Sequence, residues 1–82
     1  MYYVYRLKSI KHTGETYIGV TSDLQRRLDE HNRGDSFYTA RYAPWLVTNY
    51  FAFDDKDLAS KFEQYLKTSS GRAFGNKHFW QK

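Results

Sequence analysis

Hydrophobic and polar residues change their spacing along the chain, and the spacing predicts where strands and helices lie. Residues 2–8 (YYVYRLK) and 16–20 (TYIGV) are rich in aromatic and β-branched residues, a composition typical of strands. The segment between them contains Gly14, which favours a turn. We therefore expect the two segments to pair as an antiparallel hairpin.

A helical spacing follows the hairpin. Ser22, with Gln25 three residues later, has the pattern of a capping box and predicts a helix over residues 23–32, with Gly34 just beyond its end. Residues three and four apart are neighbours on a helix, so one face should collect several side chains. These are Leu24, Arg27, Leu28 and His31.

The middle of the chain predicts a loop and a third strand. Residues 35–44 have no clear period, and Pro44 disfavours a helix through Ala43. Residues 45–53 (WLVTNYFAF) are again typical of a strand. Apolar residues occur on both of its faces, so we expect both faces to be covered, one by each flanking helix.

A second helix follows the third strand. Either Asp54 or Asp55 can cap it, and Glu63 falls at the border of its apolar face, where a carboxylate can approach a cleft. We expect residues 68–71 (TSSG) to end this helix, and the tail over 72–82 to begin as a short helix. The predicted apolar face consists of Leu58, Phe62, Tyr65 and Leu66.

These elements predict an α+β fold, with a three-stranded antiparallel sheet flanked by helices. The order along the chain is β-β-α-β-α, with a further helix in the tail. At 82 residues the chain is expected to form a single domain over 1–82. Aromatic residues make up 20% of it, so the core should be rich in large rings.

Charge and cysteine content narrow the function classes. The formal charge of +4 is compatible with a nucleic-acid partner, although many small proteins without one are this basic. Because cysteine is absent, disulfides and thiolate zinc sites are excluded, and neither His12 nor His78 has partners at a zinc-ligand spacing. With no apolar run long enough for a membrane span and no signal-peptide pattern, we expect a soluble, cytoplasmic protein.

Two tyrosine motifs carry a resemblance to a known family. Tyr3-Val4-Tyr5 and Tyr17-Ile18-Gly19 stand about ten residues apart, and the second is followed by the predicted helix with Arg27 and His31. Together they resemble the GIY-YIG nuclease superfamily, which includes homing and restriction endonucleases, the nuclease domain of the excision-repair incision subunit and structure-specific resolving nucleases. One departure is that Tyr3 stands where the first motif has glycine.

The resemblance implies a set of site residues and one divalent cation, Mg²⁺ or Mn²⁺. Tyr5 resembles the last tyrosine of the first motif, and Tyr17 and Gly19 resemble the ends of the second. Arg27 and His31 resemble the helix pair of the family. Glu63 resembles its metal-binding glutamate, and Asn76 lies at about the distance of a late asparagine found in many members.

These residue types suit phosphodiester cleavage, which needs an activated water and stabilisation of charge on the phosphoryl oxygens. The planar guanidinium of Arg27 suits the phosphoryl group, and the carboxylate of Glu63 suits the metal. Tyr5 or Tyr17 would activate water, although a phenol is a poor base unless a nearby cation favours the phenolate. His31 is either part of this site or a charged histidine interacting with the helix dipole.

The leading hypothesis is a metal-dependent DNA endonuclease in repair or in structure-specific processing, with a protein partner that supplies specificity. The alternative is a non-catalytic or partner-dependent nucleic-acid-binding module of the same fold. A third interpretation, a small structural or protein-interaction domain, depends on the aromatic content alone. The sequence leaves open DNA versus RNA, substrate structure and oligomeric state.

Overall fold

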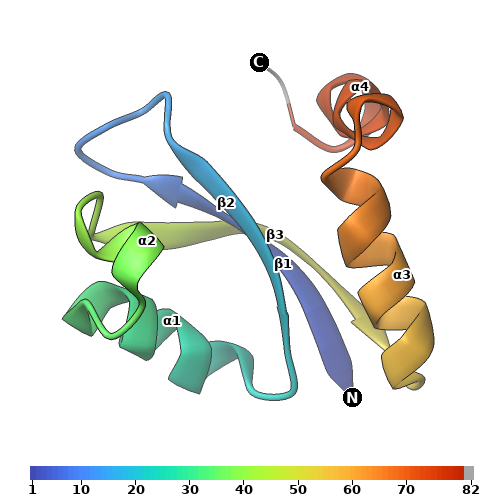
Figure 1. The fold of residues 1–82 in the computed structure, drawn as a ribbon, viewed down its shortest axis with the longest axis horizontal. Coiled ribbons are helices and arrows are strands. Elements are labelled where there is room, and N and C mark those ends of the chain that lie inside the picture. Colours follow the sequence, from blue (N-terminus) through green and yellow to red (C-terminus); the bar gives the residue numbers. More distant parts are fainter. Residues whose placement is uncertain (81–82) are drawn as a thin grey trace.

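The computed structural model describes residues 1–80 and contains a three-stranded antiparallel sheet with helices on both faces (Figure 1). The central strand is β1, giving the sheet order β2-β1-β3. The predicted fold class is confirmed, and no helix in the described part of the chain has the length and apolar composition of a membrane span. The elements are β1 (Tyr2–Ser9), β2 (Thr16–Thr21), α1 (Leu24–Arg33), α2 (Phe37–Ala40), β3 (Trp45–Phe53), α3 (Lys56–Leu66) and α4 (Ser69–His78).

Alternate side chains of β1 enter two separate cores, because successive residues of a strand point to opposite faces. Val4 is fully buried on one face, where it packs with Ala59 and Leu66 of the C-terminal half. Tyr5 and Leu7 are buried on the other face, in a cluster that includes Trp45, Leu24 and Leu28. The central strand thus places Tyr5 on the face that α1 covers.

An irregularity in the β1–β3 pairing explains why β3 has apolar residues on both faces. Arg6 pairs with Asn49, but Leu7 pairs with Val47, so Thr48 is an extra residue that changes which face its neighbours occupy. Val47 therefore packs on the side of α1, whereas Phe51 and Phe53 pack on the side of α3.

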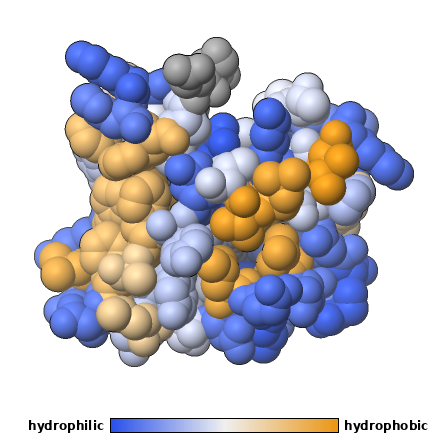
Figure 2. Space-filling view, turned by 180° about the vertical axis from the view of Figure 1, so that it is seen from behind, coloured by the Kyte–Doolittle hydropathy of each residue, from blue (hydrophilic) through white to orange (hydrophobic). Residues whose placement is uncertain are grey.

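The predicted covering of both faces of β3 is confirmed, but each helix covers only one half of the strand. Leu46 and Tyr50 remain 43% and 58% exposed. Seen from behind, the molecule shows separate apolar areas on the α3–α4 side and on the α1 side, with more hydrophilic residues between them (Figure 2).

The first helix is capped differently from the prediction. Asp23, not Ser22, is the N-cap, because its carboxylate accepts a hydrogen bond from the backbone N–H of Arg26 at 3.0 Å. Gly34 ends the helix with a φ of 83°, as its position in the sequence predicted. Leu24 and Leu28 pack into the core, so the predicted inner face of α1 is confirmed.

The buried face of α3 lies one position further along than predicted. Asp55 caps the helix, and Ala59 and Leu66 are buried with Phe62 against them. Leu58 and Tyr65, which we expected on the apolar face, are 54% and 40% exposed. The predicted face was wrong because Ala59 is small and adds little to the hydrophobic pattern of the sequence. In the structure Ala59 is fully buried, at the position where the helix packs against the sheet.

One helix occurs where a loop was expected, and the helix predicted in the tail begins earlier. Helix α2 lies inside residues 35–44 and has only four residues, too few to show a period in the sequence. In residues 68–71, Thr68 accepts a hydrogen bond from the N–H of Gly71 and caps α4, so this segment starts a helix as well as ending one. The helix predicted in the tail thus begins earlier, at Ser69, and residues 81–82 lie outside the described part.

Candidate active site

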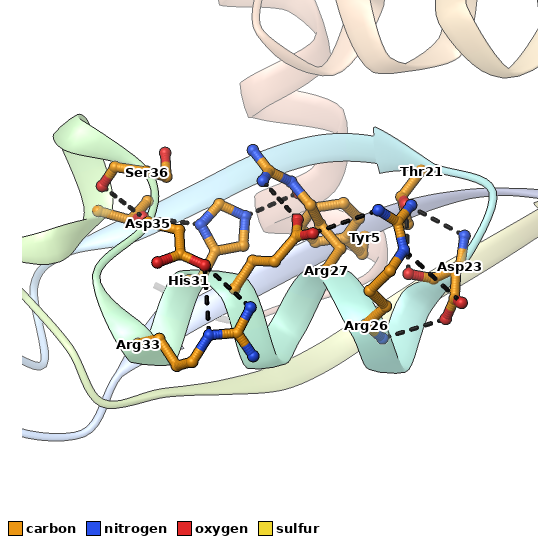
Figure 3. Close-up of polar contacts among 11 residues, drawn as sticks. Tyr5, Thr21, Asp23, Arg26, Arg27, His31, Arg33, Asp35 and Ser36 are labelled. Carbon is orange, nitrogen blue, oxygen red and sulfur yellow. Dashed lines mark hydrogen bonds and ion pairs between the residues drawn. The ribbon is translucent and has the colours of Figure 1, made fainter.

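The buried contact between Tyr5 and His31 forms the centre of the site. Tyr5 comes from β1 and His31 from the last turn of α1, and both are almost completely buried. The hydroxyl of Tyr5 lies 2.9 Å from Nε2 of His31. Figure 3 shows His31 and Arg27 on the same side of α1, directed toward Tyr5, as the helical spacing predicted.

The hydrogen bonds around His31 define which nitrogen carries the proton. Nδ1 of His31 lies 2.7 Å from Oγ1 of buried Thr39, whose hydroxyl donates to the carbonyl oxygen of Ser36 at 3.5 Å. Thr39 therefore accepts the Nδ1–H of His31, and Nε2 is left as the acceptor for the hydroxyl of Tyr5. Short helix α2 positions Thr39 for this role.

Burial keeps both partners of this contact neutral. It raises the pKa of Tyr5 to about 12, although the nearby Arg27 guanidinium favours the phenolate. Burial also lowers the pKa of His31, and the positive charge of Arg27 acts in the same direction. At neutral pH His31 is thus an uncharged acceptor, which argues against its interpretation as a charged residue at the helix end.

The second motif places Tyr17 beside this pair. The ring centroid of Tyr17 lies 5.1 Å from that of His31 and 6.3 Å from that of Tyr5. Gly19 pairs directly with Tyr5 across the β1–β2 hairpin, and a Cβ atom at Gly19 would lie 2.5 Å from the Tyr5 hydroxyl oxygen. The absence of a side chain at Gly19 lets the Tyr5 phenol lie against β2.

Arg27 is held next to the site by an ion pair. Its Nη1 donates to Oε1 of Glu30 at 2.9 Å, and its side chain is 31% exposed. Arg26 binds the other oxygen of Glu30 at 3.2 Å from a position that is 58% exposed. Glu30 therefore fixes the guanidinium of Arg27 while leaving part of it open to a ligand.

Glu63 reaches the site from α3, on the other side of β2. Its side chain is 15% exposed, and its negative charge contributes to the raised pKa of Tyr5. Nζ of Lys67 lies 2.6 Å from its Oε2 and 5.6 Å from the centre of the Tyr17 ring. Lys67 thus neutralises the carboxylate that the resemblance assigns to the metal.

The donor set fits a divalent cation that keeps most of its water. No group of three or more His, Asp or Glu side chains in residues 1–80 could enclose a metal ion. A single carboxylate, Glu63, is sufficient for Mg²⁺, which often binds through one or two carboxylates and retains several waters. A divalent cation at Glu63 would replace the ammonium group of Lys67.

Tyr17 and Asn76 line one groove of about 810 Å³ between the β1–β2 hairpin and α4. Tyr5 and His31 do not line it, because they lie behind Tyr17. The structure therefore brings Tyr5, Tyr17, Arg27 and His31 together, places Glu63 near them, and puts Asn76 in the adjoining groove.

The sequence interpretation missed several residues that shape the site. Thr39 lies in a segment without a period, so no pattern marked it. Glu30 and Lys67 lie three and four residues from Arg27 and Glu63, and this helical spacing could have predicted both ion pairs.

Comparison with known proteins identifies the class to which this fold and site belong. The sequence profile of the GIY-YIG catalytic domain matches residues 1–77. The chain therefore belongs to the GIY-YIG family, as the two tyrosine motifs predicted.

Particular relatives include small proteins and a subunit of a larger enzyme. A UPF0213 protein of Orgyia pseudotsugata multicapsid polyhedrosis virus is 42% identical over 64 residues, which cover 74% of this chain and 61% of the viral protein. The structure-specific endonuclease subunit SLX1 homolog of Drosophila mojavensis is 38% identical over 59 residues, which cover 66% of this chain and 20% of the fly protein. This chain thus spans less than two thirds of either relative.

A solved structure has the same fold. The solution NMR structure of a UPF0213 protein from Bacillus halodurans matches with a TM-score of 0.58 at 27% identity, covering 99% of this chain and 88% of that one. Together with the family match, the similarity to SLX1 proteins supports nuclease activity at the level of the family.

Proposed function

We propose that the protein is a divalent-metal-dependent endonuclease that hydrolyses phosphodiester bonds in DNA. The observation that carries the proposal is the 2.9 Å contact between Tyr5 and His31 with Arg27 beside it. A phenol that has a neutral acceptor behind it, next to a guanidinium, combines proton transfer with phosphate binding. Both are needed to cleave a phosphodiester.

Arg27 and Glu63 have electrostatic roles in this proposal. The guanidinium of Arg27 donates to the phosphoryl oxygens, where negative charge increases in the transition state. Glu63 holds the cation, Mg²⁺ or Mn²⁺, with Lys67 displaced from the carboxylate. When bound, the cation supplies Lewis-acid polarisation of the phosphoryl group and makes water more acidic.

The two tyrosines have different roles because their surroundings differ. Tyr5 accepts the proton of the attacking water at its oxygen while its own proton passes to Nε2 of His31, so His31 becomes a cation whose Nδ1–H stays bound to Thr39. Because Tyr5 is 2% exposed, this step requires Tyr17 to move aside and admit the water. Tyr17 lines the groove. We assign it the orientation of the water or of a phosphoryl oxygen.

The substrate and partner follow from similarity rather than geometry. SLX1 proteins of Drosophila mojavensis and Malassezia globosa are described as structure-specific endonuclease subunits. We propose by analogy that this chain acts on DNA of particular structure, in repair or a related process, and that a protein partner supplies specificity.

The test is nicking of duplex, single-stranded and branched DNA by purified protein in Mg²⁺, Mn²⁺ or EDTA. Cleavage that requires the metal and is lost in Glu63→Gln supports the proposal. Glu15→Gln is the control, because Glu15 also lines the groove but belongs to the turn between β1 and β2. Cleavage that persists in EDTA contradicts the assignment of Glu63.

One observation favours a second candidate, a nucleic-acid-binding module without turnover. The ammonium group of Lys67 already neutralises the carboxylate of Glu63 at 2.6 Å. Salt-dependent DNA binding with no cleavage under any metal condition would support this candidate.

A further inference from the structure

The groove beside the candidate active site carries an excess of positive charge. Four cationic side chains line it, Arg6, Lys8, Lys67 and Arg72, and of these Lys67 is paired with Glu63. Glu15 is the one carboxylate in the lining that the structure describes. In Figure 1 the β1–β2 turn and α4, which form the two sides of the groove, lie at the same end of the molecule. The excess of positive charge favours an anionic ligand.

Arg6 is the unusual member of this set because it is a buried cation without a carboxylate partner. Its relative exposure is 9%, and none of the ion pairs in residues 1–80 includes it. Its Nη1 donates to Oγ1 of Thr48 at 3.1 Å, and its guanidinium carbon lies 4.7 Å from the centre of the Trp80 ring. Burial lowers the pKa of Arg6, but an arginine stays protonated at physiological pH.

Such an arrangement is costly for a residue with only a structural role. A buried charge normally has an ion-pair partner, and an apolar side chain of similar length would pack against Trp80 without desolvation of a charge. The remaining N–H donors of Arg6 are held in a fixed orientation by Thr48 and Trp80. A largely buried guanidinium held in place at the wall of a groove is well suited to bind a phosphate.

We propose that Arg6 anchors a phosphate of the polynucleotide strand in this groove, whose lining extends from Tyr17 to Trp80. The proposal rests on the proposed function for its choice of ligand. Lys67 and Arg72, which are exposed and line the same groove, make further contacts to the same strand. Asn76 lies on the α4 side of this path.

The test is DNA binding in EDTA, where turnover does not occur. The binding constant of a fluorescein-labelled oligonucleotide, single-stranded or duplex, is measured between about 50 and 200 mM salt. Loss of one phosphate contact in Arg6→Met should reduce the slope of log K against log salt by about 0.7 for a single strand or 0.9 for a duplex. Arg33→Met is the control, because Arg33 is exposed, pairs with Asp35 and lies outside the groove.

Thermal unfolding of Arg6→Met separates this role from a structural one. If Arg6 serves the ligand, its replacement removes a buried charge without a carboxylate partner together with the contacts to Thr48 and Trp80, so the Tm of the free protein should change little. An unchanged salt slope overturns the proposal whatever the Tm does. Lack of any binding by the wild-type protein also overturns it.

A measurement on the wild-type protein covers the case in which Arg6→Met does not fold. The Nε–H resonance of Arg6 is followed by NMR during titration with the unlabelled oligonucleotide or with inorganic phosphate. The site binds a strand if the resonance shift saturates with the oligonucleotide at a much lower total concentration of phosphate groups than it does with inorganic phosphate. An equal response to both, or none, overturns it.

These outcomes are distinct from those of the nuclease test. If the protein nicks DNA but Arg6→Met keeps the full salt slope, the nuclease assignment stands and the Arg6 site is wrong. If the slope falls and no variant or metal produces cleavage, the Arg6 site stands and the nuclease assignment is wrong.

Discussion

Replacement of Gly19 by alanine tests how closely the two tyrosine motifs must pack. A Cβ atom at this position would lie 2.5 Å from the hydroxyl oxygen of Tyr5, 2.7 Å from its Cζ and 3.0 Å from Cε2 of Tyr17. These distances are too short for nonbonded atoms, so the Tyr5 ring must move. Because Tyr5 is fully buried and bound to His31, the movement also disturbs their 2.9 Å hydrogen bond.

The expected loss of stability follows from overpacking of a well-packed site, which costs roughly 1–3 kcal/mol. For a domain of this size, each kcal/mol lowers the Tm by about 4–8 °C. Cleavage should fall in Gly19→Ala even at temperatures where the protein stays folded, because Tyr5 is displaced from its proton acceptor His31. The measurement is thermal unfolding combined with single-turnover cleavage.

Gly14→Ala is the matched control, since a Cβ atom at Gly14 would meet nothing within 4 Å. Its stability should stay within about 1 kcal/mol of the wild type, because loss of chain entropy in the unfolded state is then the main effect. If Gly19→Ala is as stable and as active as Gly14→Ala, the close approach of Tyr5 to β2 is not required and this reasoning is wrong.

Two further predictions concern charge. Because the pKa of His31 is lower in the folded protein than in the unfolded chain, the unfolded chain binds more protons as the pH falls below about 6.5. The free energy of unfolding should therefore decrease as the pH falls through this range. His31→Gln should make that decrease less steep. Thermal unfolding measured across this pH range checks the prediction, and His12→Gln is the control because His12 is exposed. If the Tm of His31→Gln depends on pH as steeply as that of the wild type, the prediction is wrong. Second, Lys67→Met should bind Mn²⁺ more tightly than wild type, because the carboxylate of Glu63 loses its counter-charge. Calorimetry against Lys61→Met, a change on the same helix, measures the difference, and equal affinities contradict it.

The strands and the α1 face were predictable because they depend on local pattern. Aromatic and β-branched runs placed all three strands, and the spacing of four residues placed Arg27 and His31 on one face. Gly34 marked the end of α1 because its φ of 83° suits glycine. These features need no knowledge of the rest of the fold.

The remainder depends on contacts between distant parts of the chain. The extra residue at Thr48 in the β1–β3 pairing decides which side chains of β3 are buried, and single-strand patterns do not contain it. Thr39 binds His31 only because a single helical turn returns to α1. Arg6 becomes a buried groove residue only when α4 brings Trp80 against the sheet.

The most direct test of the account is the single-turnover rate of metal-dependent DNA cleavage by Arg27→Ala compared with Arg26→Ala. Both arginines bind Glu30, but Arg27 faces Tyr5 whereas Arg26 is largely exposed. Loss of a group that stabilises transition-state charge typically lowers the rate by about 10²–10³-fold. We predict a loss of this size for Arg27→Ala and a rate near wild type for Arg26→Ala; equal rates for the two variants would contradict the proposed role of Arg27.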